Sequence, residues 1–320
     1  MRYLKYALRR IAIAIGSVYL VVTGTLFALY PVMEGWVAAK IEEIRHSPFY
    51  KLTQTQENRL VDSVRTAYDV DESLPERLLD WWLDVPTFDW GVSVIHQEPV
   101  VAVLDDRVLR TLGYVLPGLL VAILLGVLVG VTVAITRNRL VDWGARLTTY
   151  AVLGVPVFML LYYLQYLAGA AIGVPGGEIA LPAVGQTTLA AIAIALAVVA
   201  GQVRFARASA LEQTGRDFVK TLRAKGIDRL RLARHVLRNL AVPLLSLSLA
   251  ELFGTLVIAV YVVEAVLGID GLAAVSLAAA KRADLPLVVG STLVIVYLGI
   301  AARLVQDLLA GYLDPRLRSE

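Results

Sequence analysis

The sequence predicts an all-α, polytopic membrane protein with six transmembrane helices and a helical extracellular insertion between the first two. Composition is the first reason, because the 320-residue chain is 58% hydrophobic and only 18% charged. The second is the length of its apolar runs, since a bilayer core needs roughly 20 apolar residues per helix. The qualifying runs are Leu8–Tyr30, Thr111–Ile135, Leu147–Ile172, Ala183–Val203, Val242–Val263 and Pro286–Leu309.

The loops between these runs alternate in charge. Residues 136–146 contain three Arg and one Asp, and residues 204–241 contain ten Lys or Arg and three acids. Residues 173–182 contain one Glu and no base, and residues 34–110 carry eight basic against 15 acidic side chains. Because short basic loops stay in the cytoplasm, six crossings with both termini inside the cell fit all four loops.

The first two elements of the chain are a membrane helix and an acidic segment. Residues 1–33 are predicted to form a cytoplasmic N-terminus and a retained first helix, because the apolar run is longer than a signal-peptide core. Residues 34–110 are predicted to form an extracellular acidic segment with helical spacing in its first half. A segment of this size is marginally stable alone, so we expect it to pack on the membrane domain or on a partner.

The remaining elements are a five-helix core at residues 111–310 and a cytoplasmic tail at residues 311–320. The core includes the cytoplasmic segment Thr214–Pro243, in which basic side chains lie between apolar ones. Gly226 interrupts this pattern and predicts a turn between two short helices. Most basic loops only contact lipid phosphates. The length of this segment and its own apolar positions favour a protein partner instead.

The sequence contains no recognisable nucleotide-binding, metal-binding or catalytic motif. A Gly-x-x-x-x-Gly-Lys-Ser/Thr loop is missing, so we expect this chain to bind no ATP. The histidines His46, His96 and His235 are far apart and there is no cysteine, so we expect no metal site. We therefore predict no enzyme activity in the chain alone, no catalytic residue, no cofactor and no nucleic-acid partner.

Ionisable residues inside a span need a reason, because a charge in hydrocarbon is costly. Glu251 lies within the fifth predicted span, where it either lines a translocation path or makes a polar contact with another helix. Glu264, Arg303 and Asp307 lie near span ends, and for them we expect placement at the membrane interface. Glu251 and Glu264 are the two candidates for a pathway or intramembrane polar site.

Short motifs follow one another in a specific order over nearly the whole chain. The longest are Phe218–Gly226 (FVKTLRAKG) and His235–Asn239 (HVLRN), followed by Pro243; the others are Leu74–Arg77, Asp89–Ser93, Val262–Glu264, Asp284–Pro286 and Leu313–Arg316. Together they resemble the membrane permease subunits of dipeptide/oligopeptide-type ABC importers. The chain departs from this family at Tyr30–Glu34, where Pro-Gly-Asp-Pro is usual, and at Lys220–Leu222, where an acidic and two small residues are usual.

This resemblance implies a type I importer permease fold in a prokaryotic cell membrane. It implies that residues 216–226 form a coupling helix in a groove of an ATPase subunit. The residues assigned to coupling are Arg216, Asp217, Phe218, Lys220, Thr221, Arg223, Ala224, Lys225 and Gly226. The implied partners are a second homologous permease, two ABC ATPases that carry ATP and Mg²⁺, an extracellular substrate-binding protein and membrane lipid.

The substrate is not readable from the sequence, because relatives of this type import dipeptides, oligopeptides, nickel chelates or sugars. Two other classes of function stay open. One is an ion-gradient-driven secondary transporter that uses Glu251, which would take up substrate without ATP. The other is a non-transporting membrane scaffold whose basic segment recruits a soluble protein, which would not co-purify with ATPases and a binding protein.

Overall fold

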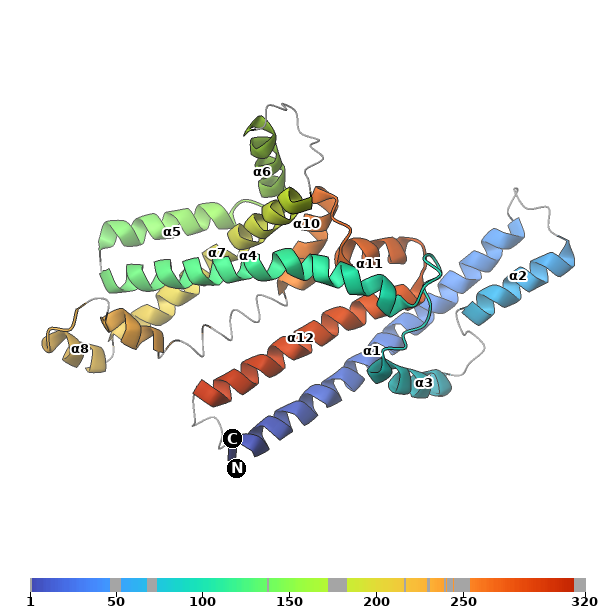
Figure 1. Cartoon of the computed structure of the whole chain (residues 1–320), viewed down its shortest axis with the longest axis horizontal. Helices are drawn as coiled ribbons and strands as arrows, with labels where there is room; N and C mark the ends of the chain where they lie inside the picture. The colour runs from blue at the N-terminus through green and yellow to red at the C-terminus, as the bar shows by residue number, and fades with distance from the viewer. Residues whose placement is uncertain are drawn as a thin grey trace. The chain divides into compact units, whose positions relative to one another are not determined.

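The described part of the chain is almost entirely helical (Figure 1). The computed structural model describes residues 2–46, 53–67, 74–136, 138–171, 183–215, 217–228, 231–238, 240, 244 and 254–313. The helices with their bounds are α1 (Arg2–His46), α2 (Gln54–Ala67), α3 (Leu74–Thr87), α4 (Val100–Thr136), α5 (Arg139–Leu153), α6 (Val157–Ala171), α7 (Ala183–Gly215), α8 (Asp217–Ala224), the π-helix η1 (Thr255–Ala259), α10 (Val260–Leu267), α11 (Leu272–Lys281) and α12 (Leu285–Leu313).

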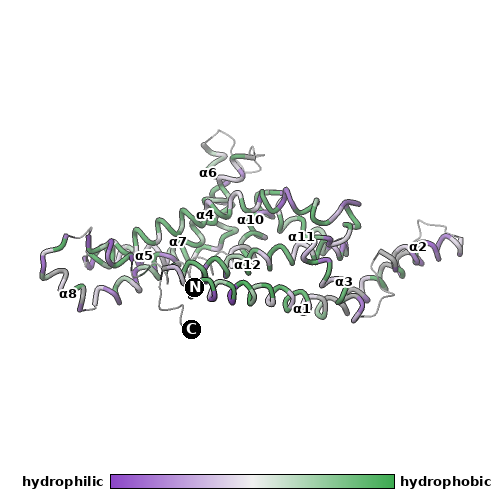
Figure 2. The backbone as a smooth tube through the Cα atoms, turned by 60° about the horizontal axis from the view of Figure 1, so that its bottom comes forward, coloured by the Kyte–Doolittle hydropathy of each residue, from purple (hydrophilic) through white to green (hydrophobic). Residues whose placement is uncertain are grey.

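Four of the described helices are long and apolar enough to cross a membrane. They lie at Tyr3–Thr25, Val100–Thr136, Val184–Gly215 and Leu285–Tyr312, and two bent helix pairs raise the number of candidate spans to six. Figure 2 shows hydrophobic residues along most of their length. The predicted class of a helical, polytopic membrane protein is therefore confirmed. Helix α1 does not end with the first predicted span, because it continues through Pro31 to His46.

The third predicted span, Leu147–Ile172, was expected to be one continuous helix, but the structure has two helices there. Helices α5 and α6 meet there at an angle of 94°. Pro156 explains the break, since it has no amide hydrogen and disfavours the helical conformation in the residue before it. Helix α5 closes just before it, where the Gly154 amide donates to the Tyr150 carbonyl over 3.0 Å.

Two compact units make up the chain, and the first contains residues Met1–Ile11, Leu109–Ala274 and Ala301–Glu320. In this unit α4 and α7 pack closely because small residues recur at every fourth position of α4. A Cβ atom on Gly118 would lie 2.6 Å from the Ala191 carbonyl oxygen, and one on Gly130 would lie 2.8 Å from the Ala206 Cβ. This small-residue spacing lets membrane helices approach each other closely.

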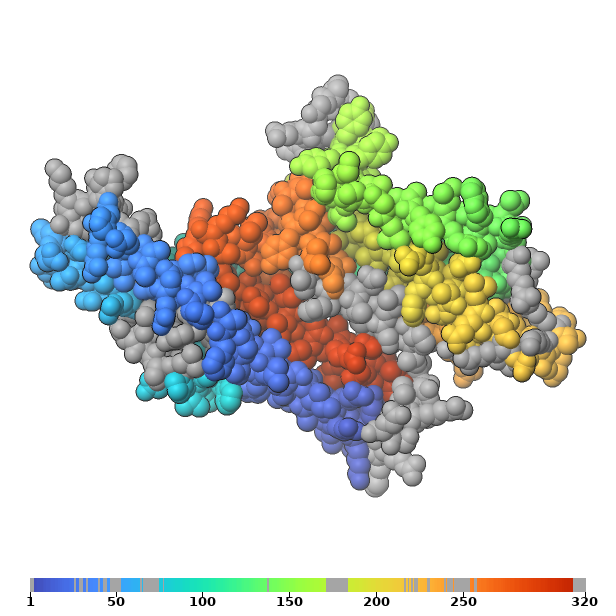
Figure 3. Space-filling model, turned by 180° about the vertical axis from the view of Figure 1, so that it is seen from behind, coloured from blue at the N-terminus to red at the C-terminus, as the bar shows by residue number. Residues whose placement is uncertain are grey.

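Helices α5 and α6 also pack on α7 in the first unit, and they lie beside it in Figure 3. At the ends of the chain, α1 packs on the last turns of α12. The Tyr6 hydroxyl donates to the Asp307 carbonyl over 3.0 Å, and Arg10 forms an ion pair of 3.2 Å with the Asp307 carboxylate. Arg303 pairs with the same carboxylate at 3.7 Å. Asp307, expected at the membrane interface, therefore lies in an ion-pair cluster.

The second unit contains Ala12–Val108 and Val275–Ile300, and here the acidic segment packs on the apolar helices. The Trp82 indole of α3 donates to the Thr23 hydroxyl of α1 over 3.1 Å. Trp90 is buried and stacks on Tyr297 of α12, with ring centroids 6.0 Å apart. The expectation that this segment packs on the membrane domain is confirmed for α3 and for the loop that follows it.

Candidate coupling segment and buried carboxylate

Helix α8 forms the first half of the predicted coupling segment. Its final turn is closed by a hydrogen bond of 3.1 Å from the Lys225 amide to the Thr221 carbonyl. Gly226 follows with φ of +73°, which lies in the left-handed region that favours glycine at the residue after a helix. The turn predicted at Gly226 is therefore present.

A second helical stretch, residues 231–238, follows the turn. The Asp228 carboxylate accepts a hydrogen bond of 2.8 Å from the Arg231 amide, which caps the start of this stretch. The segment thus has the predicted arrangement of two short helices around a glycine turn. Pro243, the last residue of the predicted segment, lies outside the described residues, and so does Arg216 at its beginning.

One apolar side chain of α8 lies in the interior of the first unit. Val219 is fully buried in a cluster with Ala206 and Ala210 of α7, and with Leu232 and Val236 of the second helical stretch. Three residues near the end of α4 also belong to the cluster: Val131, Ala134 and Ile135. Since interiors are packed as densely as crystals, this cluster ties α8 to the ends of α4 and α7.

The other face of α8 lies at the surface. Asp217, Thr221 and Ala224 are exposed, and so is Lys225 in the turn. Figure 2 shows hydrophilic residues interspersed with hydrophobic ones along this part of the chain. Phe218, Lys220 and Arg223 are residues of the same helix. The segment therefore combines a buried anchor with an accessible polar face.

Glu264 of α10 is the second feature, and its side chain lies inside the protein, hydrogen-bonded to other helices. Its side chain is only 1% exposed. The hydroxyl groups of Thr111 and Tyr114, both on α4, donate to its Oε1 over 2.6 and 3.0 Å. The Ala274 amide of α11 donates to its Oε2 over 2.8 Å.

This set of donors suits an ionised carboxylate, which only accepts hydrogen bonds. The Thr111 oxygen itself accepts the Leu272 amide hydrogen over 2.9 Å, so its own hydrogen is left for Glu264. The amides of Leu272 and Ala274 belong to the first turn of α11, where amide groups have no partner inside the helix. Glu264 and Thr111 therefore cap α11 from two other helices, and a negative charge there also suits the helix dipole.

Sequence reasoning missed Thr111 and Tyr114 as partners of Glu264, and their spacing in α4 gives no signal of this role. Glu251, the other intramembrane candidate, lies outside the described residues. Among the residues that the structure describes, no three His, Cys, Asp or Glu side chains come together as a metal site.

Residues 112–319 match the family described as binding-protein-dependent transport system inner membrane component. The chain belongs to this family. It is therefore a multi-pass membrane permease of an ABC importer of the peptide family, as the sequence motifs indicated. The family is the transport component of such importers and is not itself catalytic.

The relatives resemble this chain over most of its length. A protein provisionally named peptide permease of Brucella suis biovar 1 is 28% identical, covering 98% of this chain and 99% of its own. A provisionally named peptide transport system permease of Brucella abortus strain 2308 is 27% identical, covering 97% and 98%. The metal-staphylopine import system permease of Staphylococcus aureus strain Mu50 is 26% identical, covering 81% and 83%.

Proposed function

We propose that this permease forms half of an ATP-driven import pathway and that residues 216–226 transmit the motion of the ATPases to it. A second, homologous permease supplies the other half, and a binding protein delivers the solute outside the cell. Both termini of this chain lie in the cytoplasm. The observation that carries the proposal is the structure of α8, whose one face is exposed while Val219 lies fully buried.

The buried anchor gives a physical route for coupling. A force on the exposed face of α8 is transmitted through Val219 to the residues of α7 and α4 that surround it. Dense packing transmits strain rather than absorbing it. The glycine turn at Gly226 lets α8 stand apart from the second helical stretch, so that a partner groove has access to it.

The names of the relatives support a proposal for the substrate class. Two of the three are named for peptides and one for metal-staphylopine. We infer that the solute is a peptide or a similar small molecule. Selection among these would lie mainly with the binding protein, which delivers the loaded solute to the permease.

The test uses the complete importer, with both permeases, the ATPases and the binding protein, reconstituted in lipid vesicles. Gly226→Pro imposes a φ near −65° where the chain needs +73°, and Lys225→Glu reverses an exposed charge beside α8. We expect both variants to assemble and to hydrolyse ATP while solute uptake falls at least about tenfold, because a lost coupling contact of roughly 1.4 kcal/mol has this effect. Lys5→Glu, an exposed lysine of α1, is the matched charge control and should transport normally.

The same vesicles separate the alternatives. Unchanged uptake per ATP hydrolysed in both variants would contradict coupling through this segment. Uptake without ATP by the isolated chain would instead indicate a secondary transporter. Failure of the chain to co-purify with ATPases and a binding protein would indicate a scaffold.

A further inference from the structure

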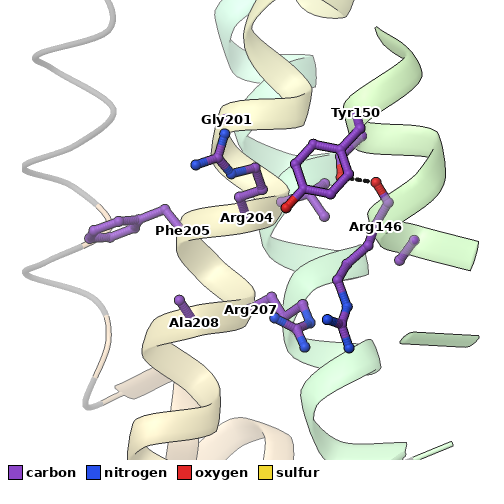
Figure 4. A pocket seen from close by; sticks show the side chains of 10 residues that line it. Arg146, Tyr150, Gly201, Arg204, Phe205, Arg207 and Ala208 are labelled. Atoms are coloured by element: carbon purple, nitrogen blue, oxygen red, sulfur yellow. Dashed lines mark hydrogen bonds between the residues drawn. The ribbon is translucent and has the colours of Figure 1, made fainter. Parts of the chain in front are cut away.

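A basic cavity of about 450 Å³ lies between α5 and α7 in the first unit (Figure 4). The residues lining it include the arginines Arg146, Arg204 and Arg207, with Thr149 and Tyr150 of α5. This cavity is separate from the coupling segment and from Glu264. Its lining is unusual for a membrane helix pair because it gathers three permanent positive charges.

One acidic side chain offsets these charges only in part. The two carboxylate oxygens of Asp142 accept hydrogen bonds from Arg146 and Arg207, one from each. In Figure 4 these two arginines reach toward the same end of the cavity, while Arg204 lies beside the Tyr150 ring. Arg204 is exposed and forms no ion pair with the residues that the structure describes. The cavity therefore keeps a net positive charge.

The cavity lies where two predicted spans end at the cytoplasmic side. Arg146 directly precedes the third predicted span, and Arg204 directly follows the fourth. Arginines at this depth meet the phosphate groups of lipids, and basic pockets between membrane helices on the cytoplasmic side suit anionic headgroups. Tyr150 adds a hydroxyl donor at the same place.

The surface of α5 beside the cavity suits acyl chains rather than water. On the membrane side of Arg146, Leu147, Tyr150 and Leu153 recur every three residues, and all three are exposed. Residues at this spacing share one face of a helix. An apolar stripe that adjoins a basic cavity matches the two parts of a phospholipid, whereas free phosphate would use only the cavity.

We propose that this cavity binds the headgroup phosphate of an anionic phospholipid. Arg204 and the Tyr150 hydroxyl hold the phosphate, with Arg146 and Arg207 adding positive charge, and the acyl chains lie on the α5 stripe. The bound lipid connects α5 to α7 by neutralising charges that otherwise repel each other. This inference rests on the membrane location and the proposed topology of the chain and is independent of coupling to ATPases.

The test uses the full chain purified in a neutral detergent, with native mass spectrometry and thermal unfolding as readouts. Phosphatidylglycerol, phosphatidylcholine and inorganic phosphate are added separately. We expect phosphatidylglycerol alone to be retained and to raise the Tm. Arg204→Gln should weaken its binding about fivefold, which corresponds to one arginine near an anionic lipid surface. Arg234→Gln, an exposed arginine outside the cavity, is the matched control and should bind phosphatidylglycerol as the unaltered chain does.

Three results would overturn the proposal. Equal retention of phosphatidylcholine would remove the role of charge. An equal rise in Tm with inorganic phosphate alone would indicate a free-anion site. An equal loss of lipid in Arg204→Gln and Arg234→Gln would indicate general attraction to basic residues. Because Arg204 is exposed, its substitution should leave the fold intact, and Tyr150→Phe, expected to weaken lipid binding by a smaller factor, provides a second check.

Discussion

Two buried carboxylates, one in each unit, both accept hydrogen bonds from amide groups at the start of a helix, but they differ in where their other partners come from. Glu264 in the first unit is 1% exposed and Asp284 in the second is 0% exposed. Neither forms an ion pair with a cation among the residues that the structure describes. Each accepts hydrogen bonds from an amide at a helix start and from a hydroxyl group. Both therefore place a negative charge where amide groups lack partners inside their helix.

The two differ in the sequence separation between each carboxylate and the helix start that it caps. Asp284 caps the helix that follows it directly, accepting the Leu287 amide over 3.3 Å, and it also binds the Ser93 hydroxyl over 2.6 Å and the Ile95 amide over 2.9 Å. Glu264 caps α11 from another helix and takes its two hydroxyl donors from α4, about 150 residues earlier. Asp284 therefore caps its own helix and also binds distant groups. Glu264 has all its partners on helices other than its own.

The largest effect is expected from Glu264→Ala. This change leaves the Thr111 and Tyr114 hydroxyls and the Ala274 amide without their acceptor inside the protein. We expect the free energy of unfolding to fall by about 3–5 kcal/mol, because each buried group left unpaired costs about 1–3 kcal/mol. The measurement is unfolding in mixed micelles. Glu34→Ala, an exposed glutamate of α1, should change stability by less than about 0.5 kcal/mol; equal losses in the two variants would refute the capping role.

A smaller effect is expected when a methyl group is added next to Glu264 instead of removing its carboxylate. A Cβ atom on Gly271 would meet the Glu264 carboxylate and would lie 2.6 Å from the Thr111 Oγ1. Because three hydrogen bonds hold that carboxylate, Gly271→Ala should destabilise the protein by about 1–3 kcal/mol, as overpacking does elsewhere.

Gly268→Ala is the control for this substitution, since it lies in the same connection between α10 and α11. Gly268 has φ of +66° and nothing within 4 Å of a new Cβ. Backbone strain alone costs about 1 kcal/mol there. If Gly268→Ala is the more damaging of the two in the same unfolding assay, the cluster around Glu264 is less rigid than its contacts indicate.

The contrast between the two carboxylates also explains what the sequence could and could not predict. The turn at Gly226 and the two helices around it were predictable because their signals are local. The break between α5 and α6 has a local signal too, Gly154-Val155-Pro156, but the length of the apolar run outweighed it in the prediction. The partners of Glu264 were not predictable, because its nearness to a span end says nothing about which distant hydroxyl groups face it.

The smallest effect, and the sharpest comparison, comes from replacing each carboxylate by its amide. Asp284→Asn can keep its oxygen toward Ser93 and Ile95 and turn its NH₂ toward the Leu287 amide, where the bond it loses is long at 3.3 Å. Asparagine is also as good a helix cap as aspartate. A Glu264→Gln side chain that keeps its oxygen toward Thr111 and Tyr114 turns its NH₂ toward the Ala274 amide and loses a bond of 2.8 Å.

We therefore expect Asp284→Asn to cost about 1 kcal/mol, the typical net value of one hydrogen bond. Glu264→Gln should cost about 2 kcal/mol, since the lost bond is charge-assisted and such bonds are worth roughly 1.5–3 kcal/mol. Both variants keep the volume of the original side chain, so a difference in their unfolding free energies reports on the donors and not on a cavity. Equal costs would mean that the nonlocal cap of α11 is no more dependent on its charge than the local cap of α12. The two carboxylates would then be equivalent in energy despite their different reach along the chain.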